Sequence, residues 1–369
     1  MHIKVALFFQ SLARAGGGAE KQLIWLANTL QKRGFEVVLI SWDSPMAASF
    51  YTLPTGVKWH KLGFEHGLRD KFRRLYRLTK LLRNENITTL IGFVVANNKV
   101  LILSGLVAGV KMVASERNSP EIYKIKNRLL GRWLTYFSLL PFDKITVQFE
   151  EFASGYPRFL KSRIVAIANP IFEVESQAKP GDPQKDRFKM LFVGRFDRIQ
   201  KQPSLLIDAF HSISNNHQNW ELTMIGDGDE RQVLENQISN LGLQEKIKLL
   251  RSKPDISDFY READLFVIPS LWEGSPNALA EAMAYGLPAI GFEVDGVKHL
   301  IKNNRTGWLC PAVNTSDLAE TLAIALRSTC SFKEFGQTAR DITKTHSEGV
   351  ISQHWCNLLL SLEGWHDRN

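Results

Sequence analysis

Short continuous apolar runs alternate along the chain with longer spans whose apolar residues recur at helical spacing. In the first half the runs cover residues 3–9, 35–42, 89–95, 111–115, 144–149 and 163–168. In the second half they cover residues 189–193, 222–225, 247–250, 265–269 and 289–292, and residues 304–311 lead into a last strand. A strand that is apolar throughout is covered on both faces. Strands that alternate with helix-length spans therefore predict an α/β chain built on parallel sheets.

A polar stretch divides this alternation into two parts. Residues 173–188 contain two prolines and a glycine and have no hydrophobic period, which is typical of a linker between domains. We therefore expect two Rossmann-like, doubly wound domains, at residues 1–172 and 189–346, and a separate terminal segment at residues 347–369. With 369 residues, 44% of them apolar, the chain is long enough to bury two hydrophobic cores.

The two halves differ in charge. Residues 1–172 hold 25 Lys and Arg against 11 Asp and Glu, whereas the remainder holds 21 against 27. The basic half is expected to meet an anionic partner: nucleic acid, phospholipid headgroups or a phosphorylated acceptor. Residues 68–86 and 122–142 combine basic with apolar and aromatic residues, a pattern typical of helices lying on anionic lipid. A packed helix with a solvated face has the same pattern. No nucleic-acid-binding motif is found, so nucleic acid is not an expected partner.

Composition bears on location. No apolar run reaches the roughly eighteen residues that a membrane span requires, and the first nine residues are too short for a signal peptide. The three cysteines have no C-x-x-C spacing, which argues against a disulfide framework or a zinc site. These observations predict a cytoplasmic protein. With the basic helices, they indicate peripheral association with the inner face of the cytoplasmic membrane.

Residues 263–292 form the most informative stretch, with the pattern strand, loop, helix, strand. Ser275 is expected as the helix N-cap, Pro276 as the first helical residue and Gly286 as the stop. A helix N-terminus presents unpaired N–H groups that can hold a phosphate. Glu273 and Glu281, eight positions apart, could accept hydrogen bonds from sugar hydroxyls on either side, which would suit a nucleotide sugar. Alternatively, Glu273 only complements the helix dipole and Glu281 lies on a solvated face.

The run E-G-S-P-N-A-L-A-E-A-M-A-Y-G-L-P-A-I resembles the E-x7-E signature of retaining GT-B glycosyltransferases, specifically glycosyltransferase family 4. The resemblance implies a GT-B fold, in which two Rossmann-like domains face a cleft and the terminal helix at residues 347–369 crosses back to the first domain. It implies that Glu281 holds the nucleotide ribose and that Glu273 contacts the donor sugar. The backbone between them would face the diphosphate, through Gly274, Ser275, Pro276, Asn277, Ala278 and Leu279.

Further motifs belong to the same resemblance. V-G-R-F-D-R-I-Q-K-Q places Gly194, Arg195 and Lys201 after a strand, where two cations could neutralise a diphosphate or serve only as surface charges. The run is similar to the V-G-R and K-G of the family, which bind that diphosphate, but the gap is longer and Gln replaces the second Gly. G-G-G-A-E, with Gly17 and Gly18, resembles the glycine-rich loop near the donor phosphate. I-G-D-G is read as a turn, not a metal site.

The run A-S-E-R-N-S-P follows a strand of the first half and should lie at the carboxyl edge of its sheet. Many family members have a His here, whereas this chain has Arg117. The run resembles a bacterial subgroup that acts on lipid-linked saccharides and exopolysaccharide. Glu116, Arg117 and Asn118 are therefore candidates for the acceptor side, without the role of the His being carried over.

Together these features predict a retaining glycosyltransferase with no metal and no cofactor besides its nucleotide-sugar substrate. Arg195 and Lys201 would stabilise the departing diphosphate, and Glu273 would orient the sugar. A hexosyl or N-acetylhexosaminyl unit, with UDP as the expected nucleotide, would pass to a lipid-linked saccharide of cell-surface polysaccharide or lipopolysaccharide. The alternative is a module that binds a sugar nucleotide or lipid phosphate without catalysis. A GT-B epimerase or phosphorylase would need carboxylates or a pyridoxal lysine that we do not find.

Overall fold

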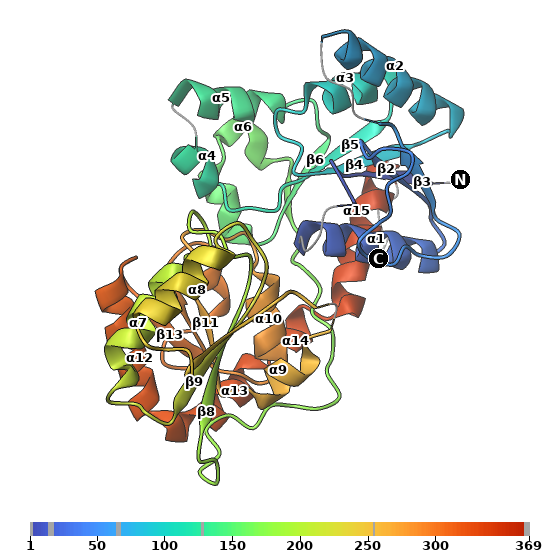
Figure 1. Cartoon of the computed structure of the whole chain (residues 1–369). Helices are drawn as coiled ribbons and strands as arrows, with labels where there is room; N and C mark the ends of the chain where they lie inside the picture. The colour runs from blue at the N-terminus through green and yellow to red at the C-terminus, as the bar shows by residue number, and fades with distance from the viewer. Residues whose placement is uncertain (1–2, 14–17, 64–67, 127–128, 254, 365–369) are drawn as a thin grey trace. The chain divides into compact units, whose positions relative to one another are not determined.

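The computed structural model describes residues 3–13, 18–63, 68–126, 129–253 and 255–364. Within it the chain forms two compact units, Met1–Pro170 with Gly349–Asn369, and Ile171–Glu348 (Figure 1). Each unit is built on a parallel sheet with helices, one sheet of seven strands and one of six. The prediction of an α/β protein with two doubly wound sheets is confirmed.

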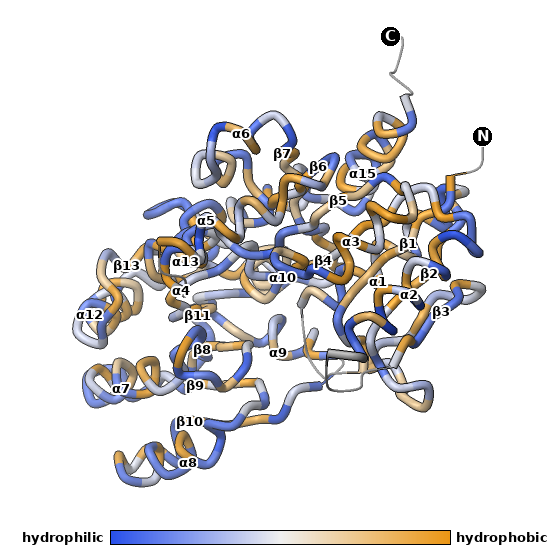
Figure 2. The backbone as a smooth tube through the Cα atoms, turned by 90° about the horizontal axis from the view of Figure 1, so that it is seen from above, coloured by the Kyte–Doolittle hydropathy of each residue, from blue (hydrophilic) through white to orange (hydrophobic). Residues whose placement is uncertain are grey.

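The first unit has the strand order β3-β2-β1-β4-β5-β6-β7. Its strands are β1 (Lys4–Phe8), β2 (Glu36–Ser41), β3 (Lys58–Lys61), β4 (Thr89–Phe93), β5 (Lys111–Ser115), β6 (Lys144–Val147) and β7 (Ile164–Ala166). Its helices are α1 (Gly18–Lys32), α2 (Leu68–Asn84), α3 (Lys99–Ala108), α4 (Glu121–Lys126), α5 (Leu129–Ser138), η1 (Glu150–Gly155), α6 (Arg158–Lys161) and the terminal α15 (Glu348–Leu362). Apart from the half-buried Lys4, every residue of β1 and β4 is buried, and the tube at β1 is largely orange in Figure 2.

One strand of this sheet was not predicted. β3, with the sequence Lys-Trp-His-Lys, lies at the sheet edge beside β2 and is only partly buried. Sequence reasoning missed it because its two outer positions are lysines and no continuous apolar run marks it. Basic residues on an edge strand also discourage pairing with another chain.

The second unit has the strand order β10-β9-β8-β11-β12-β13. Its strands are β8 (Phe188–Val193), β9 (Trp220–Ile225), β10 (Ile247–Leu250), β11 (Leu265–Ile268), β12 (Ala289–Phe292) and β13 (Gly307–Cys310). Its helices are α7 (Pro203–Ser214), α8 (Arg231–Asn240), α9 (Ser257–Glu262), α10 (Asn277–Ala284), α11 (Val297–Leu300), α12 (Thr315–Arg327), η2 (Thr329–Ser331), α13 (Phe332–Ala339) and α14 (Ile342–Thr345).

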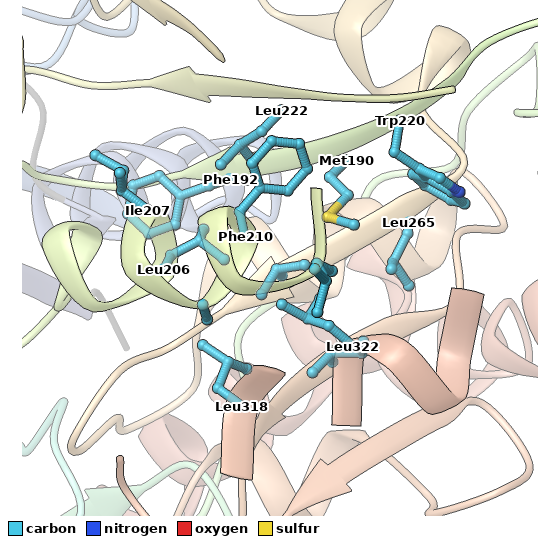
Figure 3. Close-up of a cluster of buried hydrophobic side chains, with 14 of the residues drawn as sticks. Met190, Phe192, Leu206, Ile207, Phe210, Trp220, Leu222, Leu265, Leu318 and Leu322 are labelled. Carbon is cyan, nitrogen blue, oxygen red and sulfur yellow. The ribbon is translucent and has the colours of Figure 1, made fainter. Parts of the chain in front are cut away.

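Helices cover both faces of this second sheet. On one face, Met190 and Phe192 of β8 pack against apolar side chains of α7 and α12, and Figure 3 shows Phe210 and Leu322 among them. On the other face, α10 packs against α13 and α14. Burial of a large apolar side chain contributes about 1.5–3 kcal/mol. The core therefore fixes α7 against β8, and the buried Leu279 and Met283 fix α10 against β11.

The polar stretch before β8 is fastened to the second unit by Asp264. This fully buried carboxylate accepts hydrogen bonds from the Gly181 N–H at 3.0 Å, the Lys189 N–H at 2.9 Å and the Lys185 ammonium at 2.7 Å. Ala178 also donates its N–H to the Tyr285 carbonyl at 2.9 Å. A buried carboxylate is stable only when donors surround it, so Asp264 orders the segment that enters β8.

The terminal helix α15 belongs to the first unit. The Arg33 guanidinium, at the end of α1, donates to the Ser352 hydroxyl at 2.9 Å, and Trp355 and Leu359 of α15 are buried. The helix thus adds apolar contacts to a unit that lies mostly more than 170 residues earlier in the chain.

Candidate functional site

The candidate donor site lies where the second sheet changes direction. β8 and β11 are neighbours, but the chain leaves β8 through α7 toward β9 and leaves β11 through α10 toward β12, on opposite sides. In doubly wound sheets ligands bind at the carboxyl ends of the strands at such a switch point. The predicted residues Arg195, Lys201, Glu273 and Glu281 all follow one of these two strands.

The loop after β8 is organised by Asp197. Its carboxylate accepts the Ile199 N–H at 2.7 Å, and its carbonyl accepts the N–H groups of Lys201 and Gln202, each at 3.0 Å. Gln202, where a Gly is common in the family, has φ +50°, a conformation that favours Gly. Gln202, the N-cap of α7, therefore holds a conformation with local backbone strain.

The I-G-D-G turn after β9 packs against the backbone of this loop. A Cβ on Gly226 would lie 1.9 Å from the Gly194 carbonyl oxygen, and one on Gly228 would lie 2.3 Å from the Phe196 carbonyl oxygen. Only glycine permits this approach. The two glycines therefore fix the backbone that carries Arg195, whose side chain is 62% exposed.

Lys201 and Glu273 form an ion pair that joins the two loops. The Lys201 Nζ lies 2.5 Å from the Glu273 Oε1, and Glu273 is only 5% exposed. The lysine side chain passes beside Gly194, at 3.6 Å from where a Cβ would stand. A buried carboxylate needs such a cation, so the sequence interpretation that Glu273 only complements the helix dipole does not describe its main contact.

Gln200 makes a second connection between the loops. Its Nε2 donates to the Trp272 carbonyl at 3.0 Å, its backbone carbonyl accepts the Leu271 N–H at 2.8 Å, and its Oε1 accepts from the Arg195 Nη2 at 3.3 Å. Gln200 thus ties the exposed guanidinium to the backbone next to Glu273. Gln200 lies within the V-G-R run, but nothing in that run indicates a partner 72 positions away, so its role could not be predicted from the sequence.

The start of α10 differs from the prediction by one residue. Pro276, at φ −70° and ψ 104°, is the N-cap and Asn277 the first helical residue, so the expectation of Ser275 as N-cap and Pro276 as first helical residue was wrong. The Pro276 carbonyl accepts the Ala280 N–H at 3.1 Å and so begins the helix. Pro276 lacks an N–H, so it cannot donate a hydrogen bond to a ligand at this helix end.

Glu281, one turn into α10, is held by a buried tyrosine. The Tyr260 hydroxyl lies 3.0 Å from the Glu281 Oε2 and 3.3 Å from the Ala278 carbonyl oxygen. Its ring stacks on Tyr285 with centroids 5.2 Å apart, and burial together with Glu281 raises the pKa of Tyr260 well above its usual value. The hydroxyl stays protonated and donates, so it fixes the Glu281 carboxylate. No sequence motif marks Tyr260, which precedes β11 by five positions.

One further loop supports the site. Gly296, at φ +82°, places its Cα so close to the Gly274 carbonyl oxygen that a Cβ would lie 2.5 Å from it. Residues 293–297 therefore support the backbone of Glu273 and Gly274 as the I-G-D-G turn supports Arg195. In the described part of the chain, no three His, Cys, Asp or Glu side chains gather as a metal site would require.

The acceptor-side candidates lie at the carboxyl end of β5 in the first unit. Glu116 is buried, and burial raises the pKa of its carboxyl although the Tyr123 hydroxyl donates to it. Arg117 contacts the Asn169 amide oxygen and lies over the Phe93 ring at 5.0 Å; burial lowers the pKa of Arg117 to about 10. Asn118 follows at a half-buried position.

The glycine-rich loop can be followed only in part. Gly18 is the first residue of α1, whereas Gly17 lies outside the described residues. α1 follows β1, and β1 and β4 are the neighbours at which the first sheet changes direction. Among the residues that the structure covers, no helix is long and apolar enough to cross a bilayer.

Comparison with known proteins agrees with the geometry. The family model described as glycosyl transferases group 1 matches residues 173–342. An α-1,4-N-acetyl-D-galactosaminyltransferase of Campylobacter jejuni, which acts on a diNAcBac-PP-undecaprenol-linked saccharide, is 27% identical over 355 residues, 94% of this chain and 96% of that protein. A glycosyltransferase of Haemophilus influenzae without an assigned substrate is 24% identical over 96% of this chain and 99% of its own.

Solved structures show the same fold. Anabaena HepE, in complex with UDP and glucose, superimposes with a TM-score of 0.81 at 18% identity and covers 98% of this chain and 100% of its own. The lipopolysaccharide outer core galactosyltransferase WaaB superimposes with a TM-score of 0.76 at 15% identity, over 98% of this chain and 100% of its own. At these identities the likeness establishes the architecture, which is GT-B.

Proposed function

Because the chain belongs to the group 1 glycosyltransferases and has the GT-B fold, we propose that it transfers a hexosyl or N-acetylhexosaminyl unit from a UDP-sugar, with retention, to a lipid-linked saccharide. The acceptor would belong to the biosynthesis of cell-surface polysaccharide or lipopolysaccharide. The enzyme would work at the inner face of the cytoplasmic membrane. The observation that carries the donor half of this proposal is the Lys201–Glu273 ion pair at the start of α10, with Glu281 one turn deeper.

The donor is proposed to lie across the start of α10. Its diphosphate would be placed at the backbone of residues 274–279, where N–H groups at a helix start attract negative charge. Arg195 and Lys201 would add two cations, and Gln200 would hold Arg195 toward the loop that carries Glu273. Glu281, fixed by Tyr260, would accept hydrogen bonds from the ribose.

The chemistry follows from these charges. When the glycosidic bond breaks, negative charge grows on the leaving diphosphate, and cations already in position stabilise it without reorganisation. The donor phosphates would compete with Glu273 for Lys201, and Glu273 would then be available to a sugar hydroxyl. Positioning and electrostatics can supply most of the acceleration for so good a leaving group. Attack by the acceptor hydroxyl on the same face gives retention.

The acceptor half rests on other observations. The Campylobacter jejuni relative is named for an undecaprenol-linked acceptor, and its similarity spans nearly the whole chain. The first 172 residues carry 14 more basic than acidic residues, which suits a diphosphate-linked lipid and an anionic membrane. Glu116, Arg117 and Asn118, at the carboxyl end of β5, are the proposed acceptor-side residues.

The test is a panel of labelled UDP- and GDP-sugars offered to the full chain with membrane extract as acceptor. We expect label to enter the lipid fraction with one UDP-sugar, and Glu281→Ala to abolish both transfer and nucleotide release. Label that enters only water-soluble glycans would refute the lipid acceptor and leave the transferase intact. Nucleotide binding without release or transfer, on every donor, would favour the non-catalytic module.

A further inference from the structure

The first unit exposes a large apolar face on α5 and α6. Six side chains form it, and all are at least 39% exposed: Leu129, Leu130, Trp133, Leu134, Phe137 and Phe159. We refer to these six as the α5–α6 face. Monomeric soluble proteins rarely expose contiguous apolar patches of this kind without a partner.

The α5–α6 face is a built surface and not a scatter of single residues. The Phe137 and Phe159 rings stack with centroids 5.7 Å apart, and Trp133 lies 6.0 Å from Phe137 and 6.4 Å from Phe159. The other side of α5 is anchored, because Thr135 and Tyr136 are buried and Tyr136 donates to the Gly155 carbonyl at 3.0 Å. The aromatic cluster therefore faces outward because the opposite side of α5 is packed, and not because the helix is loose.

Basic residues lie on the two helices of this face and on α4. Arg158 and Lys161 lie next to Phe159 on α6 and are exposed, Arg132 lies on α5, and Lys124 on α4 pairs with Glu121 at 2.6 Å. Residues 121–142 contain four Lys or Arg and one acidic residue. A Trp and Phe cluster bordered by cations is the combination that favours the headgroup region of an anionic bilayer. A protein that docked on this face would gain little from these cations unless its own surface were acidic.

The face is also linked to the acceptor-side residues. α4 begins three positions after Asn118, and the Tyr123 hydroxyl on α4 donates to the buried Glu116 carboxylate. The Asn97 side chain, after β4, donates to the Thr135 hydroxyl on α5 at 2.8 Å. The helices that carry the face are thus fastened to the carboxyl edge of the sheet, where the acceptor is proposed to bind.

We infer that the α5–α6 face inserts into the headgroup and upper acyl region of an anionic phospholipid bilayer, and that this is where the enzyme docks to the membrane. The inference deepens the proposed function and rests on it for the source of the acceptor. α5 lies within residues 122–142, the second of the two segments that the sequence marked as membrane candidates, whereas residues 68–86 show the stronger basic pattern. α2 exposes two large apolar side chains in its described part, Phe72 and Tyr76, so its contribution is electrostatic, whereas α5 and α6 supply the insertion.

The test compares three forms of the full chain in a vesicle co-sedimentation assay. Leu130→Gln with Phe137→Gln removes two side chains that are 73% and 51% exposed. The matched control, Val233→Gln with Ile324→Gln, removes two helical residues of similar exposure, 52% and 45%, in the second unit. Gln has nearly the helix propensity of Leu, and an unchanged melting temperature verifies that each variant folds.

With vesicles of phosphatidylcholine containing phosphatidylglycerol, we expect the wild type and the control to bind, and the Leu130 and Phe137 variant to bind roughly tenfold more weakly or worse. Binding by that variant at the wild-type level would overturn the inference. Equal binding of the wild type to pure phosphatidylcholine would contradict the anionic partner. A wild-type dimer in lipid-free buffer that the same two substitutions convert to a monomer would show that a second copy of the chain covers the face.

A second measurement on the same samples separates the docking inference from the donor proposal. Thermal stabilisation by UDP reports the second unit and should be equal in all three forms. If UDP fails to stabilise the wild type while vesicle binding depends on Leu130 and Phe137, the donor proposal fails and the docking face stands. If UDP stabilises all three and vesicle binding is unaffected by the substitutions, the docking face fails and the transferase proposal stands.

Discussion

Replacing Tyr260 by Phe isolates one hydrogen bond of the donor site. The substitution removes the hydroxyl that lies 3.0 Å from the Glu281 Oε2 and keeps the ring, which stacks on Tyr285 and packs against Phe266. The Ala278 carbonyl, the second neighbour of this hydroxyl, belongs to the first turn of α10. The variant therefore changes the orientation of Glu281 with little change in packing.

The expected magnitude follows from the type of bond. A hydrogen bond to a charged group contributes about 1.5–3 kcal/mol. Losing it costs less than this range here, because Glu281 is half-buried and water can replace the Tyr260 hydroxyl as a donor. We expect UDP to bind roughly tenfold more weakly, which corresponds to about 1.4 kcal/mol, and the free energy of unfolding to fall by about 1 kcal/mol.

The assay is isothermal titration of UDP into the wild type, Tyr260→Phe and the control Tyr285→Phe, with thermal unfolding of each. Tyr285→Phe changes the hydroxyl of the stacked ring and leaves the Tyr260 contact with Glu281 in place. Equal UDP affinity in Tyr260→Phe and the wild type would refute the idea that Tyr260 positions Glu281. Equal weakening in both variants would assign the effect to the aromatic stack instead.

Four further predictions concern other contacts. Lys201→Ala leaves the buried Glu273 carboxylate without its cation, so we expect a loss of roughly 1–3 kcal/mol of stability and a fall in kcat of about a hundredfold or more; a variant with normal kcat and a normal melting temperature would contradict the role of the pair. Gln200→Ala removes the side-chain hydrogen bonds to the Arg195 guanidinium and to the Trp272 carbonyl, so we expect kcat/KM to fall by about tenfold and the free energy of unfolding to fall by about 1 kcal/mol; an unchanged kcat/KM would remove Gln200 from the site. Burial raises the pKa of Glu116 above its usual 4.5. The stability that the protonated carboxyl contributes is therefore present below pH 4.5 and is lost as the pH rises through the folded-state pKa. Glu116→Gln should flatten this decline in urea denaturation at several pH values, and a pH profile identical to that of the wild type would contradict the assignment. Asp264→Ala removes the acceptor of three hydrogen bonds at a fully buried position. We expect the free energy of unfolding, measured by urea denaturation, to fall by about 3 kcal/mol or more. A fall below about 1 kcal/mol would show that the segment before β8 is held by other contacts.

The sheets and the donor-site loops could be predicted because their signals are local. Continuous apolar runs marked β1, β2 and the strands from β4 to β12. Gly286, at φ +84°, stops α10 where the sequence predicted. Lys201 and Glu273 meet because β8 and β11 are neighbours in the sheet; the family resemblance implied a doubly wound domain but no strand order.

What could not be predicted depends on contacts between distant residues. Tyr260 and Glu281 are 21 positions apart, and Gln200 and Trp272 are 72 apart. Such pairs follow from how the loops are packed and leave no spacing in the sequence. The one-residue shift at Pro276 arises because its ψ of 104° turns the chain before the helix begins, which residue preferences alone do not fix.

A crystal structure of the full chain with UDP would locate the donor directly. We expect the diphosphate at the backbone of residues 274–279, within hydrogen-bonding distance of Arg195 and Lys201, and the ribose hydroxyls in contact with Glu281. We also expect Lys201 to have exchanged Glu273 for a phosphate oxygen. UDP bound elsewhere, or Lys201 still paired with Glu273 while the nucleotide occupies the site, would contradict the proposed donor site.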